Sequence, residues 1–351
     1  MENNSFVIYG ANGYTGELIA TMATQYGLKP LLAGRNEASV RKVAEKLDLP
    51  FKIADINDPK GLDNLLNGQK LVVHAAGPFS RTAKQMVEAC IRNGVHYTDI
   101  NGDISCFELV KSYHEKASQA NCMLMPGTGF DVVPTDCAAK NVCEQGTGIT
   151  HLQIAFATLG STISHGTATT TLEKLGGYGV KRVDGKLIPV PIGKTGMMVD
   201  FGPKKIFTMS IPWGDVSTAH HTTGVPNIET FCAAPKSMYR LLKLQFLFNW
   251  LLRIPSVKKM LQGRIDKRAA GPDNNQLEKG TTWVWAKASD EKGNNFECRL
   301  SGPEGYLLTS HATLIIAKEI LKGNYKSGYQ TPAGCYGWDL VLKIPGVKMY
   351  Q

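Results

Sequence analysis

The sequence predicts an α/β protein in which a Rossmann-type, doubly wound parallel sheet is followed by a second, α+β domain with a largely antiparallel sheet. Three observations predict this class. Up to about residue 126, short buried strands alternate with amphipathic helices, the pattern of a parallel sheet covered by helices. A glycine-rich turn follows the first strand. Beyond residue 150, longer runs alternate polar with apolar residues, as in antiparallel sheets.

The first domain has six predicted strands that alternate with helices. Asp58 and Pro59 supply the cap and first-turn proline of a helix over 62–66, and Gly94 stands where a glycine would end a helix over 84–93. The strands are expected at residues 6–9, 30–33, 51–54, 71–74, 97–100 and 122–125.

The second domain is expected to follow a linking helix at Val133–Glu144. Strands are predicted at 151–159, 205–212, 281–288 and 296–300, with a hairpin connection at 290–295, and helices near 167–175, 235–252 and 307–321. The resulting division is a Rossmann domain at 1–132, a substrate or dimerisation domain at 133–330, and a C-terminal segment at 331–351. A return of this last segment to the first domain is one interpretation, which periodicity alone does not test.

The turn after the first strand has the composition of a dinucleotide-binding turn. Gly10 permits a tight turn off the strand, Gly13 lets the backbone approach a pyrophosphate, and Gly16 lets the helix over 17–25 pack closely on the sheet. The spacing is GxxGxxG rather than GxGxxG, and its place between a buried strand and a helix favours cofactor binding over a purely structural turn. The candidate residues are Gly10, Ala11, Asn12, Gly13, Tyr14, Thr15 and Gly16.

The end of the second strand indicates which dinucleotide binds. NAD sites usually carry an acidic residue there, whereas an arginine can pair with the 2′-phosphate of NADP. This sequence has Arg35 and Asn36 at that point. It therefore predicts NADP(H) rather than NAD(H), the alternative role for Arg35 being that of a solvated arginine at a strand end.

Three further strand ends are expected at the same edge of the sheet, because ligands of such folds lie outside the carboxyl ends of the strands. Asp55 follows the third strand and is a candidate for the adenine edge, or else a cap of the following turn. The small residues Ala75 and Ala76 precede Gly77, Pro78 and Phe79 after the fourth strand, where a cofactor could lie against backbone. The fifth strand ends at Asp99, followed by Asn101, Gly102 and Asp103.

Together these segments resemble the saccharopine dehydrogenase-like oxidoreductase family, which includes the trans-acting enoyl reductases. The matching stretches run in the family's order from residue 10 to residue 136: 10–16, 32–36, 76–79, 87–90, 94–103 and 129–136. Weaker matches follow at 164–167, 223–227 and 331–333. The resemblance implies an NADP(H)-dependent oxidoreductase with a nucleotide domain and a substrate or dimerisation domain. It does not imply saccharopine as the substrate.

Hydride transfer usually needs a proton donor near the acceptor carbon. The polar candidates are Tyr97, Asp99 and His165, each of which could instead be structural or orient the cofactor. The stretch with Gly129, Phe130 and Asp131 follows the sixth strand, so its backbone is expected near the nicotinamide, or else it forms a tight domain junction.

One further pair has the YxxxK spacing of short-chain dehydrogenases: Tyr239 and Lys243. In that family the tyrosine lies on a helix of the nucleotide domain, whereas here it lies far downstream of it. We therefore interpret the pair as non-catalytic.

Composition bears on metal sites, disulfides, cellular location and nucleic-acid binding. The eight cysteines show no CxxC pair and no histidine at zinc spacing, so neither a metal site nor a disulfide framework is expected. No basic, apolar leader opens the sequence, which predicts a cytoplasmic protein. The net charge of +9 is local rather than general, and no nucleic-acid partner is expected.

That charge is concentrated in one apolar segment. Eight basic residues and a single acid, Asp266, lie between Arg240 and Arg268, so seven of the nine net positive charges fall there. The apolar run at 241–252 is too short to span a bilayer, which needs ~20 residues. We favour a helix buried in the second domain or at a homodimer interface, the alternative being a peripheral contact with anionic membrane or a lipid-linked substrate.

The sequence thus predicts an NADP(H)-dependent oxidoreductase that moves hydride to or from a C=O, C=N or activated C=C bond of a small molecule. Two alternatives stay open. One is a catalytically silent NADP(H) sensor that regulates a partner, and the other is a lipid-interface protein in which the Rossmann domain is structural.

Overall fold

The computed structural model describes residues 6–174 and 176–350 and divides into two compact units. Unit 1 comprises the chain up to Val133 together with Tyr306–Ile344, and unit 2 comprises Pro134–Gly305 and the residues from Pro345 onward. Residues 1–5, Leu175 and Gln351 lie outside the described residues, so the last residue of the helix expected near 167–175 is not described.

Unit 1 is built on a seven-stranded sheet in the order β15-β6-β5-β4-β1-β2-β3, in which every pairing is parallel. β1 lies between β4 and β2, so the chain winds one way from β1 to β3 and the other way from β4 to β6. This reversal is the topological switch point of a doubly wound sheet, and the predicted fold class is confirmed. The strands are β1 Phe6–Tyr9, β2 Leu31–Gly34, β3 Phe51–Ile53, β4 Leu71–His74, β5 His96–Asp99, β6 Met123–Met125 and β15 Gly328–Tyr329.

The helices of unit 1 begin and end at the residues that favour such boundaries. Asn36 caps α2 by accepting a hydrogen bond from the Ser39 amide, Pro59 opens α3, and Gly94 ends α4 in the left-handed conformation. The helices are α1 Tyr14–Ala23, η1 Thr24–Tyr26, α2 Glu37–Leu47, α3 Pro59–Leu66, α4 Phe79–Asn93, α5 Ile104–Lys111, α6 His114–Gln119, α14 Gly305–Leu321, α15 Pro332–Tyr336 and η3 Trp338–Lys343. α14 starts at the last residue of unit 2.

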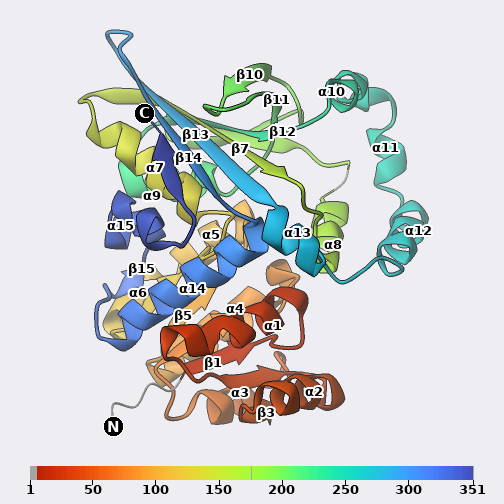
Figure 1. Ribbon diagram of the computed structural model, residues 1–351, viewed down its shortest axis with the longest axis vertical. Coiled ribbons are helices and arrows are strands. Elements are labelled where there is room, and N and C mark those ends of the chain that lie inside the picture. Colours follow the sequence, from red (N-terminus) through yellow and green to blue (C-terminus); the bar gives the residue numbers. More distant parts are fainter. Residues whose placement is uncertain (1–5, 175, 351) are drawn as a thin grey trace. The chain divides into compact units, whose positions relative to one another are not determined.

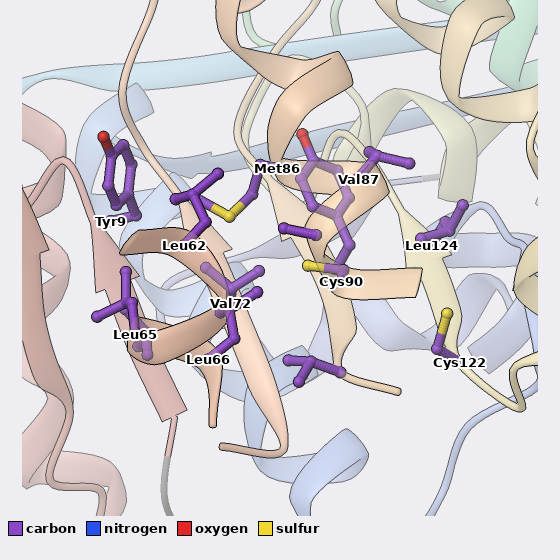
Figure 2. Close-up of a cluster of buried hydrophobic side chains, with 14 of the residues drawn as sticks. Tyr9, Leu62, Leu65, Leu66, Val72, Met86, Val87, Cys90, Cys122 and Leu124 are labelled. Carbon is purple, nitrogen blue, oxygen red and sulfur yellow. The ribbon is translucent and has the colours of Figure 1, made fainter. Parts of the chain in front are cut away.

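The core of unit 1 fills the space between this sheet and its helices. Figure 2 shows Tyr9 of β1, Leu62 of α3 and Val72 of β4 in one cluster with Met86 of α4 and Leu124 of β6. The side chains in this cluster are almost wholly buried. Because β1, β4, β5 and β6 contribute to the same cluster as α3 and α4, apolar burial fixes the ends of these strands.

Unit 2 holds a mixed, mostly antiparallel nine-stranded sheet in the order β10-β11-β12-β7-β13-β14-β16, with β8 joined to β12 and β9 to β8. The β12–β7 pair alone among the described pairings of this sheet is parallel. The strands are β7 Ile149–Leu159, β8 Gly179–Val183, β9 Lys186–Val190, β10 Gly196–Asp200, β11 Lys205–Ser210, β12 Asn227–Ala233, β13 Thr281–Asp290, β14 Asn295–Pro303 and β16 Lys348–Tyr350.

The helices of unit 2 differ from expectation in one place. The single helix predicted over 235–252 is instead three short pieces, followed by a fourth helix (Figure 1). Phe248, with φ of −127°, breaks the helical path between two of them. The helices are α7 Val133–Glu144, which begins at the last residue of unit 1's first segment, α8 His165–Glu173, α9 Asp215–Thr223, α10 Lys236–Leu242, η2 Gln245–Leu247, α11 Asn249–Leu252, α12 Pro255–Ile265 and α13 Asn274–Lys279.

The division of the chain also differs from the expected one near the C-terminus. Unit 1 resumes at Tyr306 rather than at residue 331, because α14 precedes β15, the strand that pairs with β6. The chain then leaves unit 1, and β16 pairs with β14 in unit 2. Among the described helices, none has the length and apolar character needed to cross a bilayer. All eight cysteines lie within the described residues and are free.

Candidate functional site

The candidate site lies in unit 1, along the carboxyl ends of its parallel strands. The turn at residues 10–16, here called the glycine turn, leaves β1 at Gly10, whose φ of +90° is rare for any other residue. The Gly10 amide donates to Ala33 O of β2 over 2.8 Å. A Cβ on Gly10 would lie 2.7 Å from Ala76 N, so this position also requires the absence of a side chain.

Close packing continues into α1. A Cβ on Gly16 would overlap the carbonyl oxygen of Gly10, so only glycine allows the helix to start this near the strand. No side chain caps α1, while Asn12 and Gly13 are exposed at the tip of the turn. The first amides of a helix have no partner within the helix, which makes the exposed start of α1 a suitable place for an anionic group.

The end of β2 places Arg35 beside this turn. Arg35 is exposed, and no ion pair of its guanidinium is found among the described residues. Its neighbour Asn36 uses its side-chain oxygen to accept from Ser39 N over 3.0 Å, so Asn36 caps α2. The Asn12 side chain packs over Gly34, where a Cβ would lie 2.9 Å from Asn12 Oδ1. These contacts bring the ends of β1 and β2 together.

Asp55 forms the turn after β3. Its Oδ1 accepts from Asn57 N over 2.8 Å and from Asn57 Nδ2 over 3.2 Å, which is the turn-capping role weighed for it from sequence. Nearby, the Tyr9 hydroxyl donates to Ala54 O over 3.0 Å. Burial, with the Asp55 charge adding to it, raises the pKa of Tyr9 to about 12, while the Arg35 charge opposes the shift. Both charges therefore lie near the ring of Tyr9.

The segment after β4 is held from behind by a buried hydrogen-bond chain. The Thr82 hydroxyl donates to Ala76 O over 2.8 Å, so its single proton is used there. His74 Nε2 lies 2.9 Å from Thr82 Oγ1. Because the Thr82 proton is already used, His74 Nε2 must be the donor of this hydrogen bond. This assigns the proton of the neutral ring to Nε2. Burial lowers the pKa of His74 to about 3, which keeps the ring uncharged.

The other ring nitrogen of His74, Nδ1, forms no hydrogen bond. It is buried and has no partner among the described residues. The ring is instead surrounded by aromatic neighbours, with Phe79 edge-on at 5.4 Å between centroids and Tyr9 at 5.6 Å. His74 thus packs as an aromatic residue on one side and fixes the Ala76 carbonyl, through Thr82, on the other.

Asp99 links the turns that follow β5 and β6. Its carboxylate accepts from Tyr97 Oη over 2.6 Å, from Asn101 N and Nδ2 over 3.0 and 2.7 Å, and from Gly127 N over 2.8 Å. Its main-chain oxygen accepts from Thr128 N over 2.7 Å. Tyr97 and Asp99 are fully buried, and burial raises the pKa of both groups. Two of the three candidate proton donors are therefore hydrogen-bonded to each other in the interior.

Residues 127–131 are further held by α14, from far along the chain. The Phe130 amide donates to Thr309 Oγ1 over 2.9 Å, and the Thr313 hydroxyl donates to Thr128 O over 3.2 Å. Asp131 lies over Gly102, where a Cβ would come within 2.6 Å of Asp131 Oδ2. Gly129 and Phe130 are buried and Asp131 is half-buried. The turn after β6 therefore joins the same strand-end surface as the turn after β5.

The structure brings the predicted cofactor residues to one edge of one sheet. They are Gly10, Ala11, Asn12, Gly13, Tyr14, Thr15, Gly16, Arg35, Asn36, Asp55, Ala76, Gly77, Pro78, Phe79, Gly129, Phe130 and Asp131, which follow β1, β2, β3, β4 and β6. The residues not found from sequence are supports behind this edge: His74, Thr82, Thr309 and Thr313.

The remaining candidates lie in unit 2. His165 Nε2 lies 2.9 Å from Asp266 Oδ1, at hydrogen-bond distance, and the two side chains are 42% and 54% exposed. Tyr239 and Lys243 also pair, with the Lys243 ammonium 4.6 Å from the centre of the Tyr239 ring. The Lys243 Nζ donates to Lys194 O over 2.6 Å. These contacts are those of surface helices of unit 2.

The fold and the strand-end surface define unit 1 as a Rossmann-type domain of the dinucleotide-binding class. Residues 6–125 match the family model described as "Saccharopine dehydrogenase NADP binding domain". The resemblance inferred from the sequence is thus confirmed over residues 6–125.

Curated relatives match about two fifths of the chain. A trans-acting enoyl reductase of Mycobacterium ulcerans is 29% identical over 154 residues, which are 40% of this chain and 37% of the relative. A saccharopine dehydrogenase-like oxidoreductase of Rattus norvegicus is 29% identical over 175 residues, which are 44% of this chain and 41% of the relative. The chain spans about two fifths of the length of these relatives.

Solved structures match almost the whole chain. Apo saccharopine dehydrogenase (L-Glu forming) from Saccharomyces cerevisiae aligns with a TM-score of 0.66 at 13% identity, over 99% of this chain and 100% of that one. Homospermidine synthase from Legionella pneumophila, solved in complex with NAD, aligns with a TM-score of 0.66 at 11% identity, over 99% and 91% of the two chains. At these identities the likeness concerns the fold.

Proposed function

We propose that the strand-end surface of unit 1 binds NADP(H), with the pyrophosphate at the glycine turn and the 2′-phosphate at Arg35. The observation that carries the proposal is the packing at the switch point, where Gly10 and Gly16 leave no room for a Cβ and the open start of α1 follows. This turn fits a pyrophosphate, because its exposed amides can donate to phosphate oxygens and no side chain obstructs their approach.

The choice of NADP(H) over NAD(H) rests on Arg35. An exposed guanidinium without an ion-pair partner among the described residues is available for a phosphate, which it can bind through two parallel hydrogen bonds. The acidic residue closest in sequence that could bind a ribose hydroxyl is Glu37, and its carboxylate is paired with Arg41 at 2.5 Å. The description of the matched family, which names NADP, supports the same choice.

Titration of NADPH and NADH into wild type and Arg35→Ala tests this specificity. We expect wild type to bind NADPH at least about tenfold more tightly, and Arg35→Ala to lose most of that difference while NADH affinity stays the same. Arg92→Ala is a matched control, since Arg92 lies in the last turn of α4, which precedes the start of β5 at the opposite edge of the sheet. Equal loss in both variants, or no preference in wild type, would contradict the assignment of Arg35.

We further propose that the protein is an oxidoreductase that moves hydride to or from a C=O, C=N or activated C=C bond. Bound nicotinamide supplies or accepts the hydride. The chain's own residues hold the cofactor surface in place: Thr82 fixes the Ala76 carbonyl, and Asp99 fixes the amides of residues 127 and 128. We assign Tyr97 and Asp99 a positioning role because they are buried and bonded to each other. The oxidoreductase names of the relatives support the reaction class.

A non-catalytic NADP(H) sensor is the second candidate, and the burial of Tyr97 and Asp99 favours it, since neither offers a proton from an exposed position. Oxidation of NADPH by the full chain with imino acids, aldehydes and enoyl lipids distinguishes the two. Turnover with one of these classes supports the oxidoreductase. Tight NADPH binding without turnover on any of them supports the sensor and refutes the proposed reaction.

A further inference from the structure

The segment from Lys236 to Arg268, here called the basic apolar segment, exposes large apolar side chains to an unusual extent. Phe246 is 72% exposed, Trp250 65% and Leu247 60%. Of the fourteen large apolar side chains that are exposed among the described residues, eight belong to this segment. They are Met238, Leu241, Leu244, Phe246, Leu247, Trp250, Leu251 and Met260. Apolar exposure concentrated in this way indicates a binding surface.

The side of the segment attached to unit 2 is held by polar contacts. Gln245, one of only two buried residues among those described in the segment, donates from Nε2 to Ile192 O and Leu242 O, each over 2.8 Å. Arg253 Nε donates to Gly176 O over 2.7 Å. Lys258 Nζ donates to Glu173 O over 2.7 Å. These polar contacts attach the segment to the unit together with the apolar contact of Ile265 with Ala168 and Leu172, while eight of its large apolar side chains stay exposed.

The exposed apolar residues recur throughout the helical pieces. Leu241, Leu244, Leu247 and Leu251 follow one another at intervals of three or four residues, and all four are exposed. Trp250 satisfies its own polar group locally, since its indole Nε1 donates to Leu247 O over 2.9 Å. Its ring can therefore enter an apolar environment without leaving a donor unpaired.

Basic side chains accompany this apolar surface. Five exposed bases of the segment, Arg240, Lys259, Arg264, Lys267 and Arg268, form no side-chain hydrogen bond or ion pair with any described residue. Together with the other bases they place seven of the chain's nine net positive charges between residues 240 and 268. The partner that fits this combination has an apolar interior and an anionic boundary.

We propose that the basic apolar segment binds the interface of an anionic lipid bilayer, with Phe246, Leu247 and Trp250 in the acyl boundary and the unpaired bases at the headgroups. Charge favours this occupant over a second copy of the chain, because two such segments meeting each other would bring like charges together. The apolar content favours it over nucleic acid, whose interfaces are more polar. The proposal is independent of cofactor binding in unit 1.

Co-sedimentation of the full chain with vesicles tests the proposal. The vesicles are phosphatidylcholine alone, or phosphatidylcholine and phosphatidylserine in equal amounts, at low and at high salt. We expect binding to the anionic vesicles that weakens about tenfold or more on raising the salt, and little binding to the neutral ones. No binding to anionic vesicles at low salt would overturn the proposal.

Two variants of the segment localise the contact. Phe246→Glu/Trp250→Glu removes the most exposed aromatic side chains, and Lys259→Gln/Arg264→Gln/Lys267→Gln removes three charges. Each is expected to weaken binding to anionic vesicles about tenfold or more. The matched controls, Ile188→Glu/Leu342→Glu and Lys29→Gln/Lys186→Gln/Lys348→Gln, alter exposed residues outside the segment and should bind as wild type.

Sedimentation velocity on the same variants tests the alternative that the segment binds a second copy of the chain. If the aromatic variant converts an oligomer to a monomer and still binds anionic vesicles as wild type does, the surface belongs to a second copy and the membrane proposal is refuted. If the controls lose as much vesicle binding as the segment variants, binding is not localised in the segment, and the proposal is refuted as well. Unfolding temperatures equal to wild type establish that all these surface variants are folded.

Discussion

His74 makes the stability of unit 1 depend on pH in a way that can be calculated. The ring is fully buried behind the Ala76 carbonyl, and burial lowers its pKa from the ordinary 6.5 to about 3. The folded chain therefore keeps His74 neutral at a pH where the unfolded chain protonates it. A proton bound only by the unfolded state stabilises that state, so the free energy of unfolding falls as the pH drops below 6.5.

The size of the effect follows from the two pKa values. Between the ordinary 6.5 and about 3, each pH unit of acidification removes about 1.4 kcal/mol. Going from about pH 8 to about pH 5 thus removes about 2 kcal/mol through His74. His96, whose pKa burial lowers to about 4, adds a similar contribution, which is common to wild type and to any His74 variant.

Urea unfolding of wild type and His74→Phe across this pH range isolates the contribution of His74. The aromatic neighbours Phe79 and Tyr9 can accept a phenyl ring, so the variant should fold, at a cost at high pH from the lost hydrogen bond to Thr82. That cost is constant with pH. We expect the variant to lose about 2 kcal/mol less than wild type on acidification. Parallel pH profiles of the two proteins would refute the reasoning.

Three other substitutions test separate parts of the account. Gly16→Ala should lower NADPH affinity more than tenfold and the free energy of unfolding by about 1–3 kcal/mol, because the added Cβ overlaps Gly10 O. Titration with NADPH and urea unfolding measure these two effects. Wild-type affinity would contradict the packing argument. Thr82→Val leaves the His74 Nε2 donor and the Ala76 acceptor unpaired and should lower the free energy of unfolding by about 1–3 kcal/mol. An unchanged midpoint of urea unfolding would contradict this. The Cβ added by Gly263→Ala in α12 meets no atom within 4 Å, so the substitution should raise the free energy of unfolding by about 0.5–1 kcal/mol. A lower Tm would contradict a helical conformation at this residue.

The sequence predicted unit 1 well because its signals are local. Each strand of the parallel sheet is a short buried run, and residues such as Asn36, Pro59 and Gly94 mark the helix boundaries directly. The tight geometry of the glycine turn could be predicted for the same reason, since the requirement for glycine at residues 10 and 16 arises within one strand-turn-helix unit. The supports were missed because their partners are distant: Thr309 binds residue 130 from 179 positions away.

Unit 2 was predicted less completely. Strands β8 and β9 carry basic residues, and β9 also has a proline, Pro189. Neither is a continuous buried run, since β8 is only partly buried and β9 is mostly exposed, so they lack the signal that marks strands in unit 1. The run at 241–252 has the apolar content of a buried helix, and burial was the favoured interpretation. Six of its large side chains are exposed in the single chain, so the run is not buried within unit 2, while burial at a homodimer interface stays a prediction.

Hydrogen–deuterium exchange of the full chain with and without NADPH shows where the cofactor contacts the protein. We expect slower exchange in peptides that cover the glycine turn, Arg35 and residues 75–79, with a smaller effect of NADH around Arg35. Protection confined to other segments, or no protection in the presence of saturating NADPH, would contradict the assignment of this surface as the dinucleotide site.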